Sequence, residues 1–346
     1  MSAPRPLTAP DAPGRERDAH LDNAKAVLIA LVVVGHVLEL IKGPAADTLY
    51  TFIYTFHMPA FVFLCGHFAR RFRLDGRHAR ALVTDLVIPY LVFNCVTCLV
   101  ASWSASHWVS FSPLEPTGVM WFLLALGVWR LTAPIWRAMW PTAALAIALA
   151  VALIAPLDSH TGATLSVGRI AGLLPFFVAG LIVPPRALAA LRRPGWRVAG
   201  WAVLAGLFVL ARTVLQDWPR SCFYMDHPYP ADWSWLHGMA VRAAILALAG
   251  CGIVAVLAVV PWRRCALSGI GRHSMEVYLL HFPVVLAARD IRVLGPFLTT
   301  AQPWWLVACA VVAALAFAAL LGAEPVARRL QLVTRPAWVA HLLFRR

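Results

Sequence analysis

Apolar residues recur along the chain in long runs that are separated by short polar connections. A helix that crosses a bilayer needs about 20 predominantly apolar residues, with a range of about 17–25. By this measure the sequence predicts ten spanning helices, at approximately 24–41, 49–68, 82–103, 119–139, 142–157, 168–183, 196–214, 238–260, 275–293 and 304–321. The fifth and sixth segments are short for a span. The pattern predicts an all-α polytopic membrane bundle of about ten transmembrane helices.

The composition favours the same class of protein. Hydrophobic residues make up 61% of the 346 residues and charged residues 13%, whereas soluble domains carry about 25% charged residues. The mean hydropathy is +0.73. The net charge of +14 therefore does not indicate a nucleic-acid partner. The seven cysteines lie mostly in apolar runs, so we expect buried thiols, Cys95 and Cys98 included, and neither a disulfide framework nor a metal site.

The distribution of positive charge predicts the orientation in the membrane. Most of the 30 Lys and Arg residues fall in the connections on one side of the predicted spans, and such connections stay in the cytoplasm. Both termini are then cytoplasmic in a multi-pass protein of the inner (plasma) membrane. We expect a disordered tail over 1–20 that ends in an uncleaved first helix, a membrane core over 21–321 and a basic tail over 322–346.

The first predicted span contains three ionisable residues, Lys25, His36 and Glu39. The eleven-residue step from Lys25 to His36 is about three helical turns, which places both on nearly one face about 16 Å apart. Glu39 follows one turn after His36 on that face. Ionisable groups inside a span are costly and are functional candidates by default. The span therefore predicts a cation, an imidazole and a carboxylate in a line across the bilayer.

The second predicted span carries His57 at a depth similar to that of His36. Tyr50 and Tyr54 precede it on the same helical face. Two imidazoles at one level on adjacent antiparallel helices form a candidate shared site. The alternative interpretation is a histidine that only packs against a neighbouring helix.

Five arginines follow this span within eleven residues, in the run RRFRLDGRHAR. They are Arg70, Arg71, Arg73, Arg77 and Arg80. A cluster that only sets the topology is one interpretation. Arginine also binds phosphate groups through two parallel hydrogen bonds, so an anionic cytoplasmic ligand is the other.

The later spans contain isolated polar or bulky candidates. These are Trp121, Arg169, Arg242, Glu276 and His281. Each is weak alone, and His281 is either a third imidazole of the site or a packed core residue.

The connection over 215–237 is rich in Trp, Tyr, Asp and His. It is either an aromatic belt at the membrane interface or a rim that binds sugars.

Several of these segments form a known pattern when they are taken in order. They are LDNAKAVLIALVVVGH, YTFHMPAFVFLCGHF, LVIPYLVFN, WFLLALGVWRL, LPFFVAGL and GRHSMEVYLLHFPV. Together they resemble acyltransferase family 3, the multi-pass membrane O-acyltransferases, in the branch similar to fucose 4-O-acetylase. The resemblance implies transfer of acetyl from cytoplasmic acetyl-CoA to a hydroxyl of a glycan or other acceptor at the extracytoplasmic face, without a metal.

The resemblance also implies roles for particular residues. The family pattern of a basic residue, ten residues and an essential histidine falls on Lys25 and His36. Many members have arginine where this chain has Lys25. The Arg-rich turn of the family falls on Arg70, Arg71 and Arg73, which with Lys25 are expected to bind the phosphates of coenzyme A.

The chemistry of acyl transfer extends these expectations. A sugar hydroxyl needs a base to accept its proton, and histidine is suited to this near neutral pH. We expect His36 to be the general base, with Glu39 or His57 orienting it, and Trp121 and Arg169 to contact the acceptor. Direct transfer and an acyl-histidine intermediate both stay open.

Two other classes of protein have similar composition. A transporter or flippase of lipid-linked sugars would show internal repeats or paired broken helices, which the sequence lacks. A non-catalytic scaffold gives no reason for the alignment of Lys25, His36 and Glu39.

Overall fold

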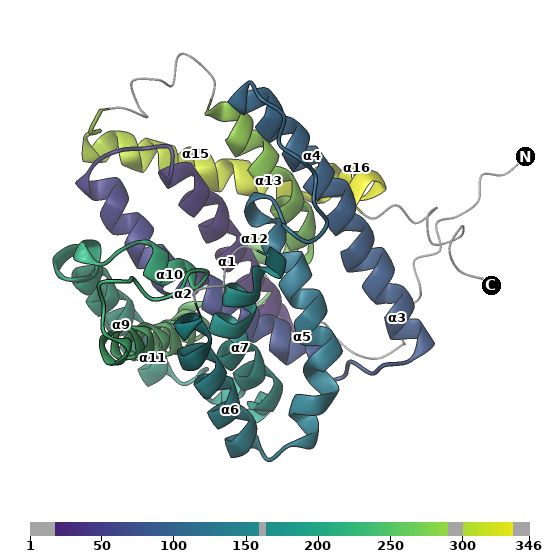
Figure 1. Cartoon of the computed structure of the whole chain (residues 1–346), viewed down its shortest axis with the longest axis vertical. Helices are drawn as coiled ribbons and strands as arrows, with labels where there is room; N and C mark the ends of the chain where they lie inside the picture. Colours follow the sequence, from purple (N-terminus) through teal and green to yellow (C-terminus); the bar gives the residue numbers. More distant parts are fainter. Residues whose placement is uncertain (1–17, 159–163, 290–299, 335–346) are drawn as a thin grey trace, which may run out of the picture.

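The chain folds into a bundle of helices (Figure 1). The computed structural model describes residues 18–158, 164–289 and 300–334, and within these ranges it contains no β-sheet. In chain order its elements are α1 (Ala19–Leu38), α2 (Pro44–Ala69), α3 (Gly76–Leu82), η1 (Val83–Val87), α4 (Ile88–Ala105), η2 (Gly118–Met120), α5 (Trp121–Ala138), α6 (Pro141–Ile154), η3 (Ala155–Leu157), η4 (Thr164–Ser166), α7 (Val167–Ile182), α8 (Pro185–Ala190), α9 (Pro194–Thr213), η5 (Leu215–Asp217), α10 (Ser221–Tyr224), α11 (Trp235–Val259), α12 (Ala266–Arg272), α13 (Ser274–Ala288), α15 (Trp304–Gly322) and α16 (Glu324–Thr334).

The predicted all-α polytopic membrane bundle is confirmed. In the described part of the chain, seven helices are long and apolar enough to cross a membrane, and three more are apolar but shorter. The shorter helices are Pro141–Leu157, Val167–Ile182 and Ser274–Ala288, which correspond to the fifth, sixth and ninth predicted spans. The last part of the ninth predicted span, from 290 onward, lies outside the described residues.

At both ends of the described chain, helical structure extends beyond the bounds that the sequence analysis predicted for the membrane core. The first helix begins at Ala19, because the side chain of Asp18 accepts a hydrogen bond of 3.0 Å from the backbone N–H of His20 and caps the helix. Helix α16 occupies residues 324–334, which the sequence analysis assigned to a basic tail. The rest of both predicted tails lies outside the described residues.

The beginning of α1 is fixed to the connection between α11 and α12. The side-chain amide of Asn23 donates to the carbonyls of Pro261 and Arg263 at 2.8 and 2.9 Å. Because α1 and α2 run in opposite directions, α2 ends at the same pole of the bundle, where the arginines of 70–80 follow it. We call this end of the bundle the arginine pole.

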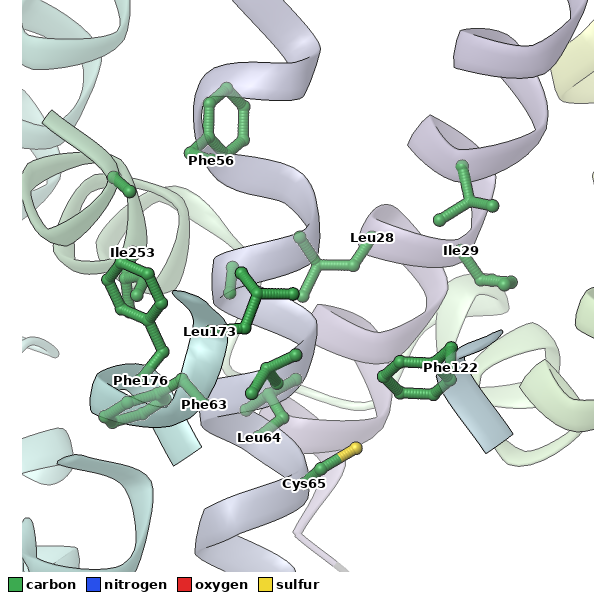
Figure 2. Packing of buried hydrophobic residues seen from close by; sticks show 14 of the residues in the cluster. Leu28, Ile29, Phe56, Phe63, Leu64, Cys65, Phe122, Leu173, Phe176 and Ile253 are labelled. Atoms are coloured by element: carbon green, nitrogen blue, oxygen red, sulfur yellow. The ribbon is translucent and has the colours of Figure 1, made fainter. Parts of the chain in front are cut away.

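Helix α2 lies at the centre of the bundle and packs against α1, α7 and α11 (Figures 1 and 2). Its Phe56 and Phe63 are buried together with Leu28 of α1, Phe176 of α7 and Ile253 of α11. These contacts hold α1 and α2 at fixed positions, and α1 and α2 carry His36 and His57.

Two glycines allow α2 and α7 to approach very closely. A Cβ atom added to Gly66 would lie 2.0 Å from the carbonyl oxygen of Phe177, and one added to Gly180 would lie 2.0 Å from that of Phe63. Real Cβ atoms do not come this close to a backbone oxygen. The α2–α7 contact therefore depends on glycine at both positions, as is common between membrane helices.

Replacing Gly180 with alanine is expected to destabilise the bundle. The added methyl group must push α2 and α7 apart, and overpacking of this kind costs about 1–3 kcal/mol. The measurement is thermal unfolding of the detergent-solubilised protein, compared with Gly206→Ala in α9, where a Cβ atom would meet nothing within 4 Å. Equal melting temperatures for the two variants would show that the α2–α7 contact tolerates the larger side chain.

Candidate active site

A cavity of about 240 Å³ lies around His36, away from the arginine pole. We call it the His36 cavity. It is lined by Val32, His36, Glu39, Tyr54, His57, Met58, Gly118, Val119, Trp121, Phe122, Arg169, Leu173, Phe223, Tyr224, Tyr278 and Phe282. The structure thus brings together the five residues that the sequence analysis assigned to catalysis and to acceptor contact.

Glu39 orients the ring of His36. Oε2 of Glu39 lies 3.4 Å from Nδ1 of His36, one turn earlier. A carboxylate in this position accepts the Nδ1 proton, which leaves Nε2 of His36 with its lone pair. Of the two orienting residues that the sequence allowed, the geometry favours Glu39.

Tyrosine hydroxyls hold the other oxygen of this carboxylate. Oε1 of Glu39 accepts hydrogen bonds from Tyr50 at 3.0 Å and from Tyr54 at 2.9 Å. The hydroxyls of Tyr50 and Tyr224 are 2.5 Å apart. Burial raises the pKa of Tyr224, so its phenol stays protonated at ordinary pH. Glu39 is therefore fixed between an imidazole and a chain of phenols.

His57 has its own fixed tautomer. Its Nδ1 lies 2.8 Å from the carbonyl oxygen of Ile53, which can only accept, so the proton is on Nδ1 and the lone pair is on Nε2. The ring packs edge-on against Tyr54 at 4.7 Å between centroids. His57 thus offers the cavity a hydrogen-bond acceptor.

Arg169 and Trp121 form one side of the cavity. The guanidinium of Arg169 lies over the Trp121 ring, 5.0 Å from its centroid, and pairs with the carboxylate of Asp226. Phe223 and Tyr224 of α10 come from the 215–237 connection and also line the cavity. This part of the connection therefore contributes to the cavity.

Replacing Asp226 with asparagine is expected to weaken acceptor binding three- to tenfold. Arg169 would lose a charged partner worth about 1 kcal/mol, and its guanidinium would no longer be held over the Trp121 ring. The measurement is the KM for the acceptor, with the KM for the donor as an internal reference. Asp217→Asn, an exposed position in η5, is the matched control. A similar rise in both KM values would show a general disturbance rather than loss of the Arg169 position.

A second cavity, of about 460 Å³, lies nearer the arginine pole. We call it the Lys25 cavity. It is lined by Asp18, Leu21, Asp22, Lys25, Phe61, Leu64, Cys65, Phe68, Phe122, Leu126, Arg130, Arg272, Ser274, Met275 and Tyr278. Nζ of Lys25 pairs with Asp22 at 2.7 Å. Arg130 and Arg272 form no ion pair with a carboxylate of the described residues, and together with Lys25 they outnumber the two carboxylates of the cavity, Asp18 and Asp22.

The two cavities share a wall made of Phe122 and Tyr278, which line both. Their ring centroids are 5.6 Å apart. The hydroxyl of Tyr278 donates to the carbonyl of Val119, which holds its ring in the wall. At this spacing the two rings are in contact, so a linear ligand that crosses the wall from the Lys25 cavity toward His36 must displace them.

Comparison with models of protein families identifies the family of this chain. The model of an acyltransferase domain matches residues 18–323, nearly the whole chain. The chain belongs to this acyltransferase family. The match confirms the resemblance to acyltransferase family 3 that the sequence motifs indicated.

One curated relative of this acyltransferase is the Nodulation protein NolL of Sinorhizobium fredii (strain NBRC 101917 / NGR234). The two chains are 34% identical over 126 residues, which are 32% of this chain and 34% of that protein. The match thus spans about a third of the length of the relative. No solved structure matches the chain.

The arginine cluster of the acyltransferase is not in the Lys25 cavity. Nη1 of Arg70 donates to the carbonyl of Val183 at 2.6 Å, which ties the end of α2 to the end of α7. Arg71 lines a smaller cavity of about 200 Å³ that also includes Arg130, and Arg73 is exposed. Of the four residues predicted to bind phosphate, only Lys25 lines the larger cavity.

The sequence analysis did not single out several residues that form the two cavities. Arg130 and Arg272 counted only toward the charge of one side, and Tyr224 was one of many aromatic residues in its connection. Phe122 and Tyr278 stand in apolar runs. Their roles depend on contacts between distant segments, and nothing in the local sequence distinguishes them.

Proposed function

We propose that the protein is a membrane O-acetyltransferase that moves an acetyl group from cytoplasmic acetyl-CoA to a hydroxyl of an extracytoplasmic or lipid-linked glycan, such as an exopolysaccharide. One observation carries the proposal. A cavity with a fixed, basic imidazole and a cavity with uncompensated cations meet at the wall of Phe122 and Tyr278. This is the arrangement that a reaction between a charged donor from one side and a neutral hydroxyl from the other requires.

The Lys25 cavity accounts for the donor. Coenzyme A carries phosphate groups, and guanidinium groups bind phosphates through short charge-assisted hydrogen bonds. Arg130 and Arg272 would bind them at the arginine pole, which faces the cytoplasm by the charge distribution of the chain. The carboxylates of Asp18 and Asp22 repel phosphate and restrict it to the arginine side of the cavity. The pantetheine arm would then cross the wall of Phe122 and Tyr278 toward His36, and the two rings would move aside to admit it.

The His36 cavity accounts for the chemistry. Nε2 of His36 accepts the proton of the acceptor hydroxyl while the oxygen forms a bond to the thioester carbonyl carbon. The bond between carbon and sulfur breaks, and His36 returns the proton to the sulfur, so the products are the acetyl ester and coenzyme A as its thiol. Glu39 keeps Nδ1 protonated and stabilises the imidazolium, as the carboxylate of a catalytic triad does.

The remaining groups of the cavity fit a sugar acceptor. The aromatic face of Trp121, held under Arg169, presents an apolar surface of the kind on which a sugar ring packs. Nε2 of His57 accepts a hydrogen bond from a sugar hydroxyl. Arg169 donates to ring or hydroxyl oxygens. These contacts select a polyhydroxylated acceptor over an aliphatic alcohol.

The experiment that tests the proposal follows labelled acetyl from acetyl-CoA into endogenous glycan in membranes that contain the wild type or His36→Ala at matched expression. We expect transfer by the wild type alone. Equal label in both membranes would exclude His36 from the mechanism, and no consumption of acetyl-CoA by either protein would favour a flippase instead. Loss of O-acetyl signals from surface glycan after deletion of the gene would then identify the acceptor.

A further inference from the structure

A second histidine, His281, lies fully buried beside His36. It belongs to α13 and has 0% exposure. Its Nδ1 lies 3.0 Å from the carbonyl oxygen of Val277, one turn earlier. Because that carbonyl only accepts, the proton is on Nδ1 and the lone pair is on Nε2. Among the described residues, Nε2 of His281 has no hydrogen-bond partner.

An unpaired buried nitrogen of this kind calls for an explanation, because nearly all buried polar atoms are hydrogen-bonded. Replacing the histidine by an apolar residue of similar size would remove the cost. His281 does not line the His36 cavity, so contact with the acceptor does not account for it.

The position of the His281 ring suggests an explanation for its unpaired Nε2. The ring centroids of His36 and His281 are 5.4 Å apart, with their planes inclined at 34°. Phe282 packs edge-on against His36 at 5.2 Å and closes this side of the ring. The nitrogens are not within hydrogen-bonding distance in the free protein, but catalytic hydrogen bonds are often long in the free enzyme and shorten when the substrate binds.

Other titratable groups around the two rings are engaged elsewhere. Glu39 holds Nδ1 of His36 and two tyrosines, and His57 donates to its own helix. On the elements packed against α13, the hydroxyl of Tyr90 in α4 donates to Pro113, and that of Tyr278 in α13 itself donates to Val119.

We infer that His281 is a positioning residue whose Nε2 accepts a hydrogen bond from Nε2–H of His36 while His36 carries the proton of the acceptor hydroxyl. Glu39 and His281 then hold the two N–H groups of the imidazolium from opposite sides. The proton stays on His36 until the sulfur of the departing coenzyme A takes it, so no net proton is gained or lost. This role rests on the proposed function.

The first test compares steady-state kinetics of His281→Phe, which removes the acceptor, and His281→Gln, whose amide oxygen can replace it. A hydrogen bond to a charged group corresponds to about 10- to 100-fold in rate. We expect His281→Phe to lower kcat by that factor with both KM values unchanged, and His281→Gln to recover most of the loss. Leu279→Ala, also fully buried in α13, is the control for packing. It should not reproduce the loss of kcat at unchanged KM that is expected for His281→Phe.

Equal losses of kcat in the Phe and Gln variants would overturn the inference, as would normal kcat in His281→Phe. A second measurement does not depend on turnover. In the ¹⁵N spectrum of the histidine-labelled full chain, the Nε2 signal of His281 should shift when acidification protonates His36, and should not shift in His36→Gln. A signal that stays constant in the wild type, or that moves equally in both proteins, would overturn the inference even if the wild type transfers no acetyl group.

Discussion

Glutamine in place of His36 is expected to lower acetyl transfer by about 10²- to 10⁴-fold, the usual contribution of a positioned general base. Glutamine is close in size to histidine and keeps a polar group beside Glu39, but it cannot accept and return a proton. The loss should appear in kcat, whereas the KM for acetyl-CoA should change little because His36 does not line the Lys25 cavity. The assay is initial-rate transfer of labelled acetyl in membranes with verified amounts of protein.

His107→Gln is the matched control for this experiment. It makes the same chemical change at an exposed position after α4, and we expect wild-type rates from it. Full activity of His36→Gln would remove proton transfer by this side chain from the mechanism, whichever route the acetyl group takes.

The double substitution of Arg130 and Arg272 by glutamine is expected to raise the KM for acetyl-CoA by at least about 100-fold. Each guanidinium is assigned a charge-assisted hydrogen bond to phosphate, worth about 1.5–3 kcal/mol, or about 10- to 100-fold for a single bond. The rate at saturating donor should stay within a few-fold of the wild type, because neither side chain lines the His36 cavity. The measurement is the dependence of the rate on the concentration of acetyl-CoA, with direct binding of the labelled donor as a check.

Arg73→Gln tests the same charge loss at an exposed position in the arginine cluster. It should leave the KM for acetyl-CoA nearly unchanged. If Arg73→Gln raised the KM and the double variant did not, the donor would bind along the Arg-rich turn that the sequence indicated, and the Lys25 cavity would serve another purpose.

The spans were predictable because length and apolar content alone decide which helices cross a bilayer. The third predicted span, 82–103, lies within the longer helical stretch Gly76–Ala105, whose first turns are polar and therefore carried no hydropathy signal. The sequence analysis also did not predict α8 and α12, which are short connecting helices, or α16, which follows the last apolar helix. Hydropathy detects only helices that are apolar enough to cross the bilayer. The short helices depend instead on contacts within the protein.

The pairing of His36 with Glu39 was predictable because the two residues are close in sequence. His36 and Glu39 are one helical turn apart, so the periodicity of a single helix brings them together. The residues proposed to bind the donor are different, because Arg130 of α5 and Arg272 of α12 meet only after the bundle has packed. The Arg-rich turn was the stronger local pattern, yet its Arg70 ties α2 to α7 through the carbonyl of Val183.

The shared wall of Phe122 and Tyr278 has a consequence for the cell as a whole. A membrane protein whose polar cavities joined into one channel would threaten the ion gradients on which the cell depends. Apolar constrictions stop ions because water does not fill them readily. In this bundle the contact between the two aromatic rings is an apolar barrier of this kind between the His36 cavity and the Lys25 cavity. Under the proposed function, the protein would pass an acetyl group across this barrier while the two rings keep the membrane sealed to protons and salts.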